Sequence, residues 1–376
     1  MRYSVSGGGT GGHIYPALAV ARALRDARPG AELDYIGGVR GFERNLVASH
    51  PLRSQLSYHE LVVRSLRTSG ASVHAVLDPA RLAASVPQAW WLLGRLRPAA
   101  LFTTGGYLAL PLVLAARSRG IPTLVWEGNV VPGRATRAIG RFATRVAVSF
   151  PPTLDAFPGN SFVSGTPIRS FDGIDRAAAR HALGLDPDDR LLLVFGGSQA
   201  VARLNQSTFG ALERLLADWH VLHLAGEAGM ADAGAARQSL PDDLRPRYTA
   251  EPFVTDRMAD VLVAADLVVG RAGSSTCAEL AAAGLPSILV PYPYAGAHQR
   301  YNASYMADEG AALMVPDAEF DADRLVREAT ALRDDARRDA IASAARRLGR
   351  ADAAAVLADE LIALAERRYR PTEAAT

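Results

Sequence analysis

The chain has 376 residues, of which 49% are hydrophobic and 21% are charged, and its formal net charge is +2. This length favours two domains over one, and the charge argues against nucleic acid as the main partner. The sequence contains no lysine, which excludes a Schiff-base lysine and the lysine of a Walker loop. Cys277 is the only cysteine, so an intrachain disulfide is excluded and a reducing cytoplasm is expected.

The first half of the chain alternates strand-like and helix-like segments. It begins directly with a strand pattern and lacks the features of a signal peptide. Strands are predicted at residues 3–6, 32–36, 99–103 and 123–126, and helices at residues 14–28 and 109–119. This alternation is typical of a parallel α/β sheet. Proline and glycine accumulate at residues 151–167, where we place the interdomain linker.

The second half repeats the same alternation. Strands are predicted at residues 191–195, 220–224, 267–269 and 287–290, and helices at residues 204–217, 275–283 and 301–309. Residues 322–367 are helical by propensity, either as an outer helix of the second domain or as a strap that returns to the first. We expect domains at residues 1–163 and 164–345, and a C-terminal helix within residues 346–376. The sequence has no run of about 18 apolar residues, so no membrane span is expected.

Two glycine-rich loops carry the clearest functional signal. Residues 7–12 precede His13 and follow the first predicted strand, and residues 196–199 follow the strand at 191–195. Each loop leads into a helix N-terminus, where glycine allows close approach of a ligand and the helix dipole favours negative charge. Ligands of open α/β sheets bind beyond the carboxyl ends of the strands, so we expect both loops and residues 105–107 and 128–129 to line one cleft.

The first loop also satisfies the pattern G-x-G-x-x-G through Gly7, Gly9 and Gly12. The next strand does not end in the acidic residue that a dinucleotide ribose needs, because Asp34 lies inside it, so a nicotinamide cofactor is disfavoured. His13 lies near the positive end of the helix dipole, which favours the neutral imidazole of a general base. A purely structural role in capping the helix explains this position equally well.

Further polar residues follow the predicted strands of the second half. Ser275 and Thr276 open a helix and suit a diphosphate, and Glu279, one turn later, suits two ribose hydroxyls. His298 and Gln299 lie in a polar loop that suits sugar hydroxyls. The structural alternatives are a first-turn acid that complements the helix dipole and an ordinary helix start.

A stretch between residues 62 and 98 interleaves arginine with apolar residues and contains the pair Trp90 and Trp91. Its arginines are Arg64, Arg67, Arg81, Arg95 and Arg97. This composition suits an anionic membrane surface, whereas a helix whose tryptophans pack inward is an equal alternative. Metal-ligand spacing and a G-x-S-x-G elbow are both missing from the sequence, so neither a metal nor serine hydrolase chemistry is expected.

Taken together, these motifs resemble the MurG family of N-acetylglucosaminyl transferases, which convert lipid I to lipid II in peptidoglycan synthesis. The matching segments are residues 8–13 with Pro16, 105–107, 127–129, 196–199 with Asn205, 273–279 and 281–286. The resemblance covers nearly the whole chain. It implies an α/β GT-B fold of two Rossmann-like domains facing an interdomain cleft, the first for the lipid acceptor and the second for UDP-N-acetylglucosamine (UDP-GlcNAc).

The resemblance further implies an inverting transfer to the C4 hydroxyl of the muramoyl sugar of lipid I, without a metal or cofactor. Such an activity serves cell-wall biogenesis, cell shape and cell division. The implied location is peripheral, at the cytoplasmic face of the cell membrane. The implied partners are UDP-GlcNAc, lipid I, an anionic membrane surface and cell-wall synthesis proteins, with no nucleic acid.

By position, the resemblance makes His13 the candidate catalytic base. On the acceptor side it assigns Thr10, Gly11, Gly12, Gly106, Tyr107, Glu127 and Asn129. On the UDP-GlcNAc side it assigns Arg169, Gly197, Ser198, Gln199, Val254, Ser275, Thr276, Glu279, His298 and Gln299.

The chain departs from the family at Gly128, Thr166 and Ala200, where glutamine, asparagine and glycine are usual. The departures leave room for another acceptor, and three alternatives to the leading interpretation stay open. They are a related GT-B transferase with another acceptor, a UDP-GlcNAc 2-epimerase, and a non-catalytic protein that binds a nucleotide sugar.

Overall fold

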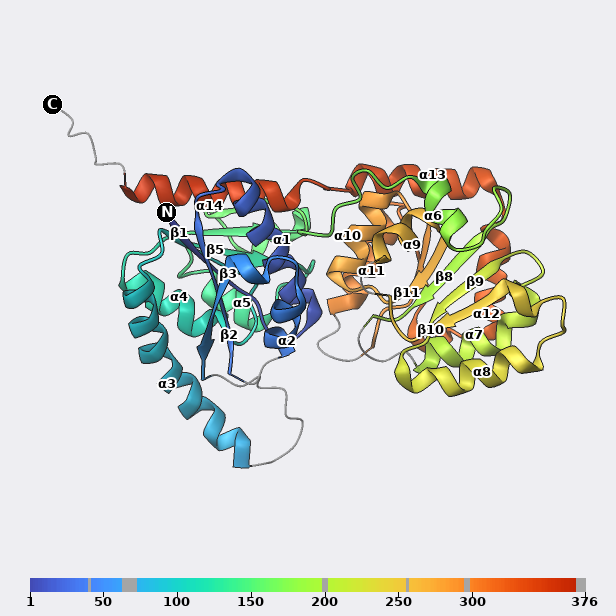
Figure 1. The fold of residues 1–376 in the computed structure, drawn as a ribbon, viewed down its shortest axis with the longest axis horizontal. Coiled ribbons are helices and arrows are strands. Elements are labelled where there is room, and N and C mark those ends of the chain that lie inside the picture. The colour runs from blue at the N-terminus through green and yellow to red at the C-terminus, as the bar shows by residue number, and fades with distance from the viewer. Residues whose placement is uncertain (40–41, 63–72, 198–201, 255–256, 294–297, 370–376) are drawn as a thin grey trace. The chain divides into compact units, whose positions relative to one another are not determined.

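The computed structural model describes residues 1–39, 42–62, 73–197, 202–254, 257–293 and 298–369. The chain divides into two units, each built on its own parallel sheet (Figure 1). The first unit comprises Met1–Ile168 together with Ala351–Thr376, and the second comprises Arg169–Arg350. These divisions lie a few residues after the boundaries that the sequence predicts.

The first unit has a seven-stranded sheet in the order β3-β2-β1-β4-β5-β6-β7. Its strands are β1 (Arg2–Ser6), β2 (Glu32–Gly38), β3 (Leu56–Leu61), β4 (Ala100–Thr103), β5 (Thr123–Glu127), β6 (Arg145–Val148) and β7 (Ser161–Val163). Its helices are α1 (Gly11–Ala27), α2 (Phe42–Ser49), α3 (Val73–Leu96), α4 (Ala109–Ser118), α5 (Arg134–Ile139) and α14 (Ala353–Tyr369). Two 3₁₀ turns, η1 (Arg53–Gln55) and η2 (Pro151–Ala156), complete it.

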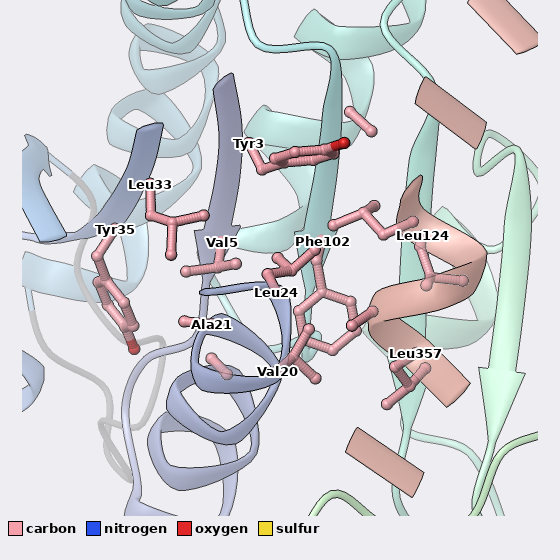
Figure 2. Packing of buried hydrophobic residues seen from close by; sticks show 14 of the residues in the cluster. Tyr3, Val5, Val20, Ala21, Leu24, Leu33, Tyr35, Phe102, Leu124 and Leu357 are labelled. Atoms are coloured by element: carbon pink, nitrogen blue, oxygen red, sulfur yellow. The ribbon is translucent and has the colours of Figure 1, made fainter. Parts of the chain in front are cut away.

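Alternating side chains of β4 contribute to two different apolar cores of this unit. Phe102 of β4 belongs to the core that contains α1 and α14, whereas its neighbour Leu101 belongs to the core that contains α3 and α4. Figure 2 shows the first of these cores, with Val5 and Phe102 of the sheet, Val20 of α1 and Leu357 of α14. The C-terminal helix α14 therefore completes the core of the first unit.

The second unit has a six-stranded sheet in the order β10-β9-β8-β11-β12-β13. Its strands are β8 (Leu191–Phe195), β9 (His220–Leu224), β10 (Tyr248–Glu251), β11 (Leu267–Gly270), β12 (Ser287–Leu289) and β13 (Leu313–Met314). Its helices are α6 (Arg176–Ala182), α7 (Ala202–Leu215), α8 (Met230–Ser239), α9 (Met258–Ala264), α10 (Ser274–Ala283), α11 (His298–Asp308), α12 (Ala322–Ala331) and α13 (Asp335–Leu348). The 3₁₀ turns are η3 (Glu227–Gly229), η4 (Arg245–Arg247) and η5 (Asp317–Glu319).

Every strand and helix that the sequence predicts is present, with shifts of a few residues at the ends. The sequence analysis missed five strands, namely β3, β6, β7, β10 and β13. The predicted linker at residues 151–167 is wrong in its first part, because it contains η2 and β7 and β7 pairs with β6 at the edge of the first sheet. The prolines mislead here, since proline fits the first turn of a 3₁₀ helix.

Both sheets reverse their strand order at one point, between β1 and β4 in the first unit and between β8 and β11 in the second. At such a point the loops that leave two adjacent strands run to opposite faces of the sheet, which opens a crevice at the carboxyl ends of the strands. The glycine-rich loops follow β1 and β8. Each unit therefore carries one of them at its switch point.

A buried polar network ties the second unit's sheet to α7. His223 of β9 contacts Asn205 Oδ1 through Nε2 at 3.0 Å and the Tyr248 hydroxyl through Nδ1 at 3.1 Å. Asn205 also donates through Nδ2 to the carbonyl of Ala225 at 2.9 Å, so its Oδ1 accepts from the imidazole. Burial lowers the pKa of His223 to about 4, so the buried ring is neutral near pH 7.

We expect this histidine to make the protein less stable in acid. The unfolded chain binds a proton at His223 below pH ~6.5, whereas the folded chain resists protonation down to pH ~4. Its stabilising effect is therefore complete above pH ~6.5 and is lost as the pH falls toward 4, by up to about 3 kcal/mol. Urea unfolding at pH 7.5 and 4.5 measures this loss, and His223→Gln should flatten the pH dependence. An equal slope in both proteins would exclude His223 as its source.

Candidate active site

The switch point of the first unit brings His13 against the loop that follows β4. His13 Nδ1 lies 2.7 Å from the carbonyl oxygen of Thr104, and Thr104 Oγ1 donates to the carbonyl of His13 at 2.9 Å. Because a carbonyl only accepts, Nδ1 carries the proton, and the neutral ring then keeps its lone pair on Nε2. This is the tautomer that a general base needs, with its acceptor nitrogen fixed by the bond at the other nitrogen.

The turn beside His13 is formed by Gly105 and Gly106, whose φ angles are +82° and +75°. This left-handed backbone is strained for residues with a Cβ. A Cβ at Gly106 would lie 3.9 Å from His13 Nε2, so the missing side chain keeps the backbone of this turn close to the imidazole. The sequence-predicted pair His13 and Gly106 is thus brought together.

The N-terminus of α1 supplies the other part of this crevice. Thr10 is its N-cap residue, and the carbonyl of Thr10 accepts from the N–H groups of His13 and Ile14 at 3.0 and 3.1 Å. Gly11 and Gly12 form the first turn, and Gly12 is exposed. First-turn N–H groups have no partner inside a helix and suit an anion.

Glu43 holds the glycine-rich loop after β1 in place. The sequence analysis did not identify this residue. Its carboxylate is fully buried, with 0% of the residue exposed. Oε1 accepts from the Gly38 N–H and the Tyr107 hydroxyl, both at 2.8 Å, and Oε2 accepts from the Gly9 N–H at 3.4 Å. Burial, followed by the bond to Glu43, raises the pKa of Tyr107, which keeps its phenol protonated and donating. One carboxylate thus joins the loops after β1, β2 and β4.

The loop after β5 is organised in the same way by Glu127, which is 4% exposed. Its Oε1 accepts from the backbone N–H and the side-chain amide of Asn129, both at 3.0 Å, and its Oε2 accepts from the Gly133 N–H at 3.1 Å. Glu127 therefore shapes the loop and orients Asn129.

In the second unit, Glu279 of α10 forms an ion pair with Arg169. Arg169 Nε lies 2.7 Å from Glu279 Oε1. Burial raises the pKa of Glu279, and the Arg169 guanidinium opposes this shift. The pair holds the carboxylate in a fixed position on the first turns of α10, so that Oε2 can accept from a ligand hydroxyl.

Ser275 and Thr276 occupy the first turn of the same helix. The hydroxyl of Ser275 is buried and has no hydrogen-bond partner within the described part of the chain. Buried polar groups are rarely left in this state, so a ligand oxygen is a fitting partner. Gly197, with φ +72°, follows β8 at the adjacent position in the sheet, while Ser198 and Gln199 lie outside the described residues.

The remaining residues predicted to bind the donor follow β10 and β12 along the chain. Val254 follows β10 and is half-buried. His298 is the first residue of α11, and Gln299 accepts through Oε1 from the Tyr292 N–H at 3.0 Å, which ties α11 to the loop after β12. Gln299 is thereby engaged in holding the loop.

Arg271 is a second residue that the sequence analysis left without a role. It is buried directly after β11 and donates to the carbonyl of Val290 at 3.1 Å and to Asp317 Oδ1 at 2.5 Å. Its guanidinium also lies 5.5 Å from the centre of the Tyr292 ring. Arg271 therefore links the loops after β11 and β12.

The tryptophans of α3 are exposed, so the inward-packing alternative is wrong. Trp90 is 48% and Trp91 is 60% exposed. The guanidinium of Arg119 lies 3.6 Å from the centre of the Trp90 ring, and that of Arg95 lies 5.8 Å from the centre of the Trp91 ring. Arg64 and Arg67 lie outside the described residues. Of the helices in the described ranges, none combines the length and the apolar character that a membrane span requires.

Comparison with known proteins places this arrangement in a family. Residues 3–148 match the glycosyltransferase family 28 N-terminal domain, and residues 191–358 match the corresponding C-terminal domain. A Nocardioides sp. relative is 42% identical, with 92% of this chain and 93% of the relative covered. A Moorella thermoacetica relative is 39% identical over 93% and 95% of the two chains. Both are named UDP-N-acetylglucosamine–N-acetylmuramyl-(pentapeptide) pyrophosphoryl-undecaprenol N-acetylglucosamine transferase.

Solved structures agree with these relatives. The crystal structure of Acinetobacter baumannii MurG superposes with a TM-score of 0.75 at 27% identity and covers 96% of this chain and 99% of its own. The calicheamicin glycosyltransferase CalG4 superposes with a TM-score of 0.71 at 16% identity, over 98% and 100% of the chains, which shows the fold. The predicted GT-B class of two Rossmann-like α/β domains is thereby confirmed. The chain belongs to glycosyltransferase family 28 and, within it, to the MurG family of N-acetylglucosamine transferases.

Proposed function

We propose that the protein transfers N-acetylglucosamine from UDP-GlcNAc to the C4 hydroxyl of the muramoyl sugar of lipid I, which gives lipid II. The observation that carries this proposal is His13, which its Nδ1 bond to the Thr104 carbonyl fixes beside the Gly105–Gly106 turn. The names of the relatives, which cover nearly the whole chain, support both substrates. The enzyme is accordingly a hexosyltransferase of peptidoglycan synthesis.

The first unit binds the acceptor in this proposal. The acceptor diphosphate occupies the first turn of α1, at Thr10, Gly11 and Gly12, because the N–H groups there suit an anion. His13 Nε2 takes the proton of the acceptor hydroxyl, and Asn129, oriented by Glu127, binds the reacting sugar. Gly106 provides the approach to His13, and Tyr107 holds the loop through Glu43.

The second unit binds UDP-GlcNAc. The diphosphate lies at the N-terminus of α10, where Ser275 and Thr276 supply hydroxyls, with Gly197, Ser198 and Gln199 of the glycine loop beside it. Glu279, held by Arg169, accepts from the ribose hydroxyls. Val254 faces the uracil. His298 and Gln299 contact the donor sugar.

The chemistry is a single displacement at the anomeric carbon. The bond between the acceptor O4 and C1 of the donor forms while the bond between C1 and the UDP oxygen breaks, so the configuration inverts. The hydroxyl proton moves to His13, and the negative charge of the departing UDP is met by backbone amides and hydroxyls at the start of α10. No metal is required for this step, because these fixed donors stabilise the leaving group.

We expect Glu279→Gln to weaken UDP-GlcNAc binding while preserving the fold. The amide keeps the shape of the side chain but removes its negative charge. In the unaltered protein this charge pairs with Arg169 and strengthens the hydrogen bond to the ribose. A charged hydrogen bond contributes about 1.5–3 kcal/mol, so KM for UDP-GlcNAc should rise by about tenfold or more. Initial rates with varied donor measure this. If the KM for UDP-GlcNAc and the KM for the acceptor were both unchanged, Glu279 would not be a donor-binding residue.

An assay with labelled donor separates the proposed transfer from its alternatives. The purified protein is incubated with radiolabelled UDP-GlcNAc, with and without a lipid I analogue, and lipid-linked product and free UDP are followed. Acceptor-dependent UDP release with label in the lipid supports the proposal. Epimerised UDP-sugar without acceptor supports an epimerase, and binding without turnover supports a nucleotide-sugar-binding protein.

We further propose that the protein is peripheral and contacts the cytoplasmic face of the membrane through α3. The exposed rings of Trp90 and Trp91 and the nearby guanidinium groups of Arg95 and Arg119 support this contact. Indole rings prefer the interfacial depth of a bilayer, and arginine pairs with anionic headgroups.

We expect Trp90→Ala with Trp91→Ala to weaken binding to anionic vesicles by at least about fivefold, since each exposed ring loses its interfacial contact. Co-sedimentation with vesicles of phosphatidylglycerol and phosphatidylcholine measures it. The matched control is Phe253→Ala, an exposed aromatic residue of the second unit. Unchanged co-sedimentation of the double variant would contradict a membrane role for α3.

A further inference from the structure

The first unit contains a cleft of about 900 Å³ that the proposed transfer step does not use. It lies among the loop after Asn129, the helix α5 and the turn η2. Its walls include Val131, Pro132, Arg137, Arg141, Pro152 and Phe157. Pockets for small ligands span about 300–1,000 Å³, so this cleft accepts a group much larger than one sugar ring.

The loop that holds Asn129 continues directly into the cleft. Val130, the next residue, lies on the wall. Thr153 of η2 donates through Oγ1 to the carbonyls of Asn129 and Val130 at 3.1 and 2.9 Å, which fixes the loop against the opposite wall. A molecule whose reacting sugar contacts Asn129 can therefore extend into the cleft along the same loop.

The helix α5 connects the cleft to the turn beside His13. Thr136 packs against this turn, since a Cβ at Gly105 would lie 3.0 Å from Thr136 Oγ1. The next residue, Arg137, lines the cleft. The same short helix α5 therefore contributes to the turn beside the candidate base and to the wall of the cleft.

The charge of the walls favours an anionic occupant. Arg137 and Arg141 are exposed, and within the described part of the chain neither forms an ion pair or a hydrogen bond to a side chain or backbone carbonyl. Asp155 is the acidic residue on the walls, so two guanidinium groups face one carboxylate. Proline and valine supply the apolar surface between them.

We propose that this cleft binds the peptide of the acceptor, with Arg137 and Arg141 pairing with its terminal carboxylate. The inference rests on the proposed function, in which the muramoyl sugar carries a peptide. The glycine loop and Asn129 account for the diphosphate and the sugar, and the peptide is the remaining anionic part of that substrate. Guanidinium groups match a carboxylate with two parallel hydrogen bonds.

The test compares two acceptors, a lipid I analogue with its peptide and the same analogue without it. In Arg137→Ala with Arg141→Ala, KM for the peptide-bearing acceptor should rise about tenfold, since hydrogen bonds between charged groups are lost. KM for the peptide-free acceptor and for UDP-GlcNAc should stay unchanged. The matched control, Arg134→Ala, alters an exposed arginine of α5 outside the cleft and should change none of these values.

Ala156→Trp gives a second, independent variant, because Ala156 lines the cleft and a large ring there takes up part of the space. It should raise KM for the peptide-bearing acceptor alone. An equal rise for both acceptors would assign the cleft to the lipid or the diphosphate and overturn the proposal, as would no rise in either variant. Failure of the proposed function looks different, since the unaltered protein would then transfer sugar to neither acceptor.

Discussion

His13→Ala should lower kcat/KM for transfer by at least about 100-fold, because general base catalysis contributes about 10²–10⁴-fold. The hydrogen bond from Nδ1 to the Thr104 carbonyl fixes the ring with Nε2 as the base, and alanine removes that base while leaving helix α1 intact. KM for UDP-GlcNAc should change little, since His13 belongs to the first unit. Steady-state rates with each substrate varied in turn measure these effects.

The pH profile separates loss of a base from a structural defect. In the unaltered enzyme kcat/KM should rise with pH as the imidazole loses its proton, and the variant should lack this limb. His181→Ala is the matched control, because His181 is an exposed histidine on α6 of the second unit. If His13→Ala kept a rate within a few-fold of the unaltered enzyme, or kept the same pH profile, His13 would not be the general base.

The sequence predicted the parts of the fold that follow from hydrophobic pattern and turn chemistry. β8 is five consecutive apolar residues and is buried on both faces, which is the pattern of a central parallel strand. β3, in contrast, reads Leu-Ser-Tyr-His-Glu-Leu, with exposed or half-buried residues between its two buried ends, because it lies at the edge of the sheet. Edge strands with this composition give no periodic signal that distinguishes them from loops.

The residues of the candidate site likewise include some that local sequence signals predict and some that they do not. His13 and Gly106 were predictable, because glycine at a strand end and histidine at a helix start are local signals. Glu43 was not, because its role depends on three donors, Gly9, Gly38 and Tyr107, that meet only in the folded chain. Glu127 is predicted to bind the acceptor, and the structure adds a role that no local pattern indicates, since its oxygens accept from Asn129 and from the Gly133 N–H in the loop after β5.

Glu43→Ala should destabilise the first unit and impair the acceptor reaction. Removing the carboxylate leaves the buried Gly38 N–H without an acceptor, and it also removes the partner of the half-buried Tyr107 hydroxyl and of the exposed Gly9 N–H. An unsatisfied buried donor costs about 1–3 kcal/mol, so the Gly38 N–H alone should lower the free energy of unfolding by at least about 1 kcal/mol. Urea unfolding measures this loss.

The kinetics of Glu43→Ala should show a defect with the acceptor and none with UDP-GlcNAc. At a temperature where it stays folded, kcat/KM for the acceptor should fall by at least about tenfold, because the loop that precedes His13 is no longer fixed, while KM for UDP-GlcNAc should hold. Glu43→Gln keeps one acceptor oxygen and should recover part of both effects. Glu60→Gln, which alters a partly exposed glutamate paired with Arg44, is the control. If Glu43→Ala kept normal stability and normal acceptor kinetics, the glycine loop would owe its position to the Tyr35 hydroxyl bond to the Gly7 carbonyl instead.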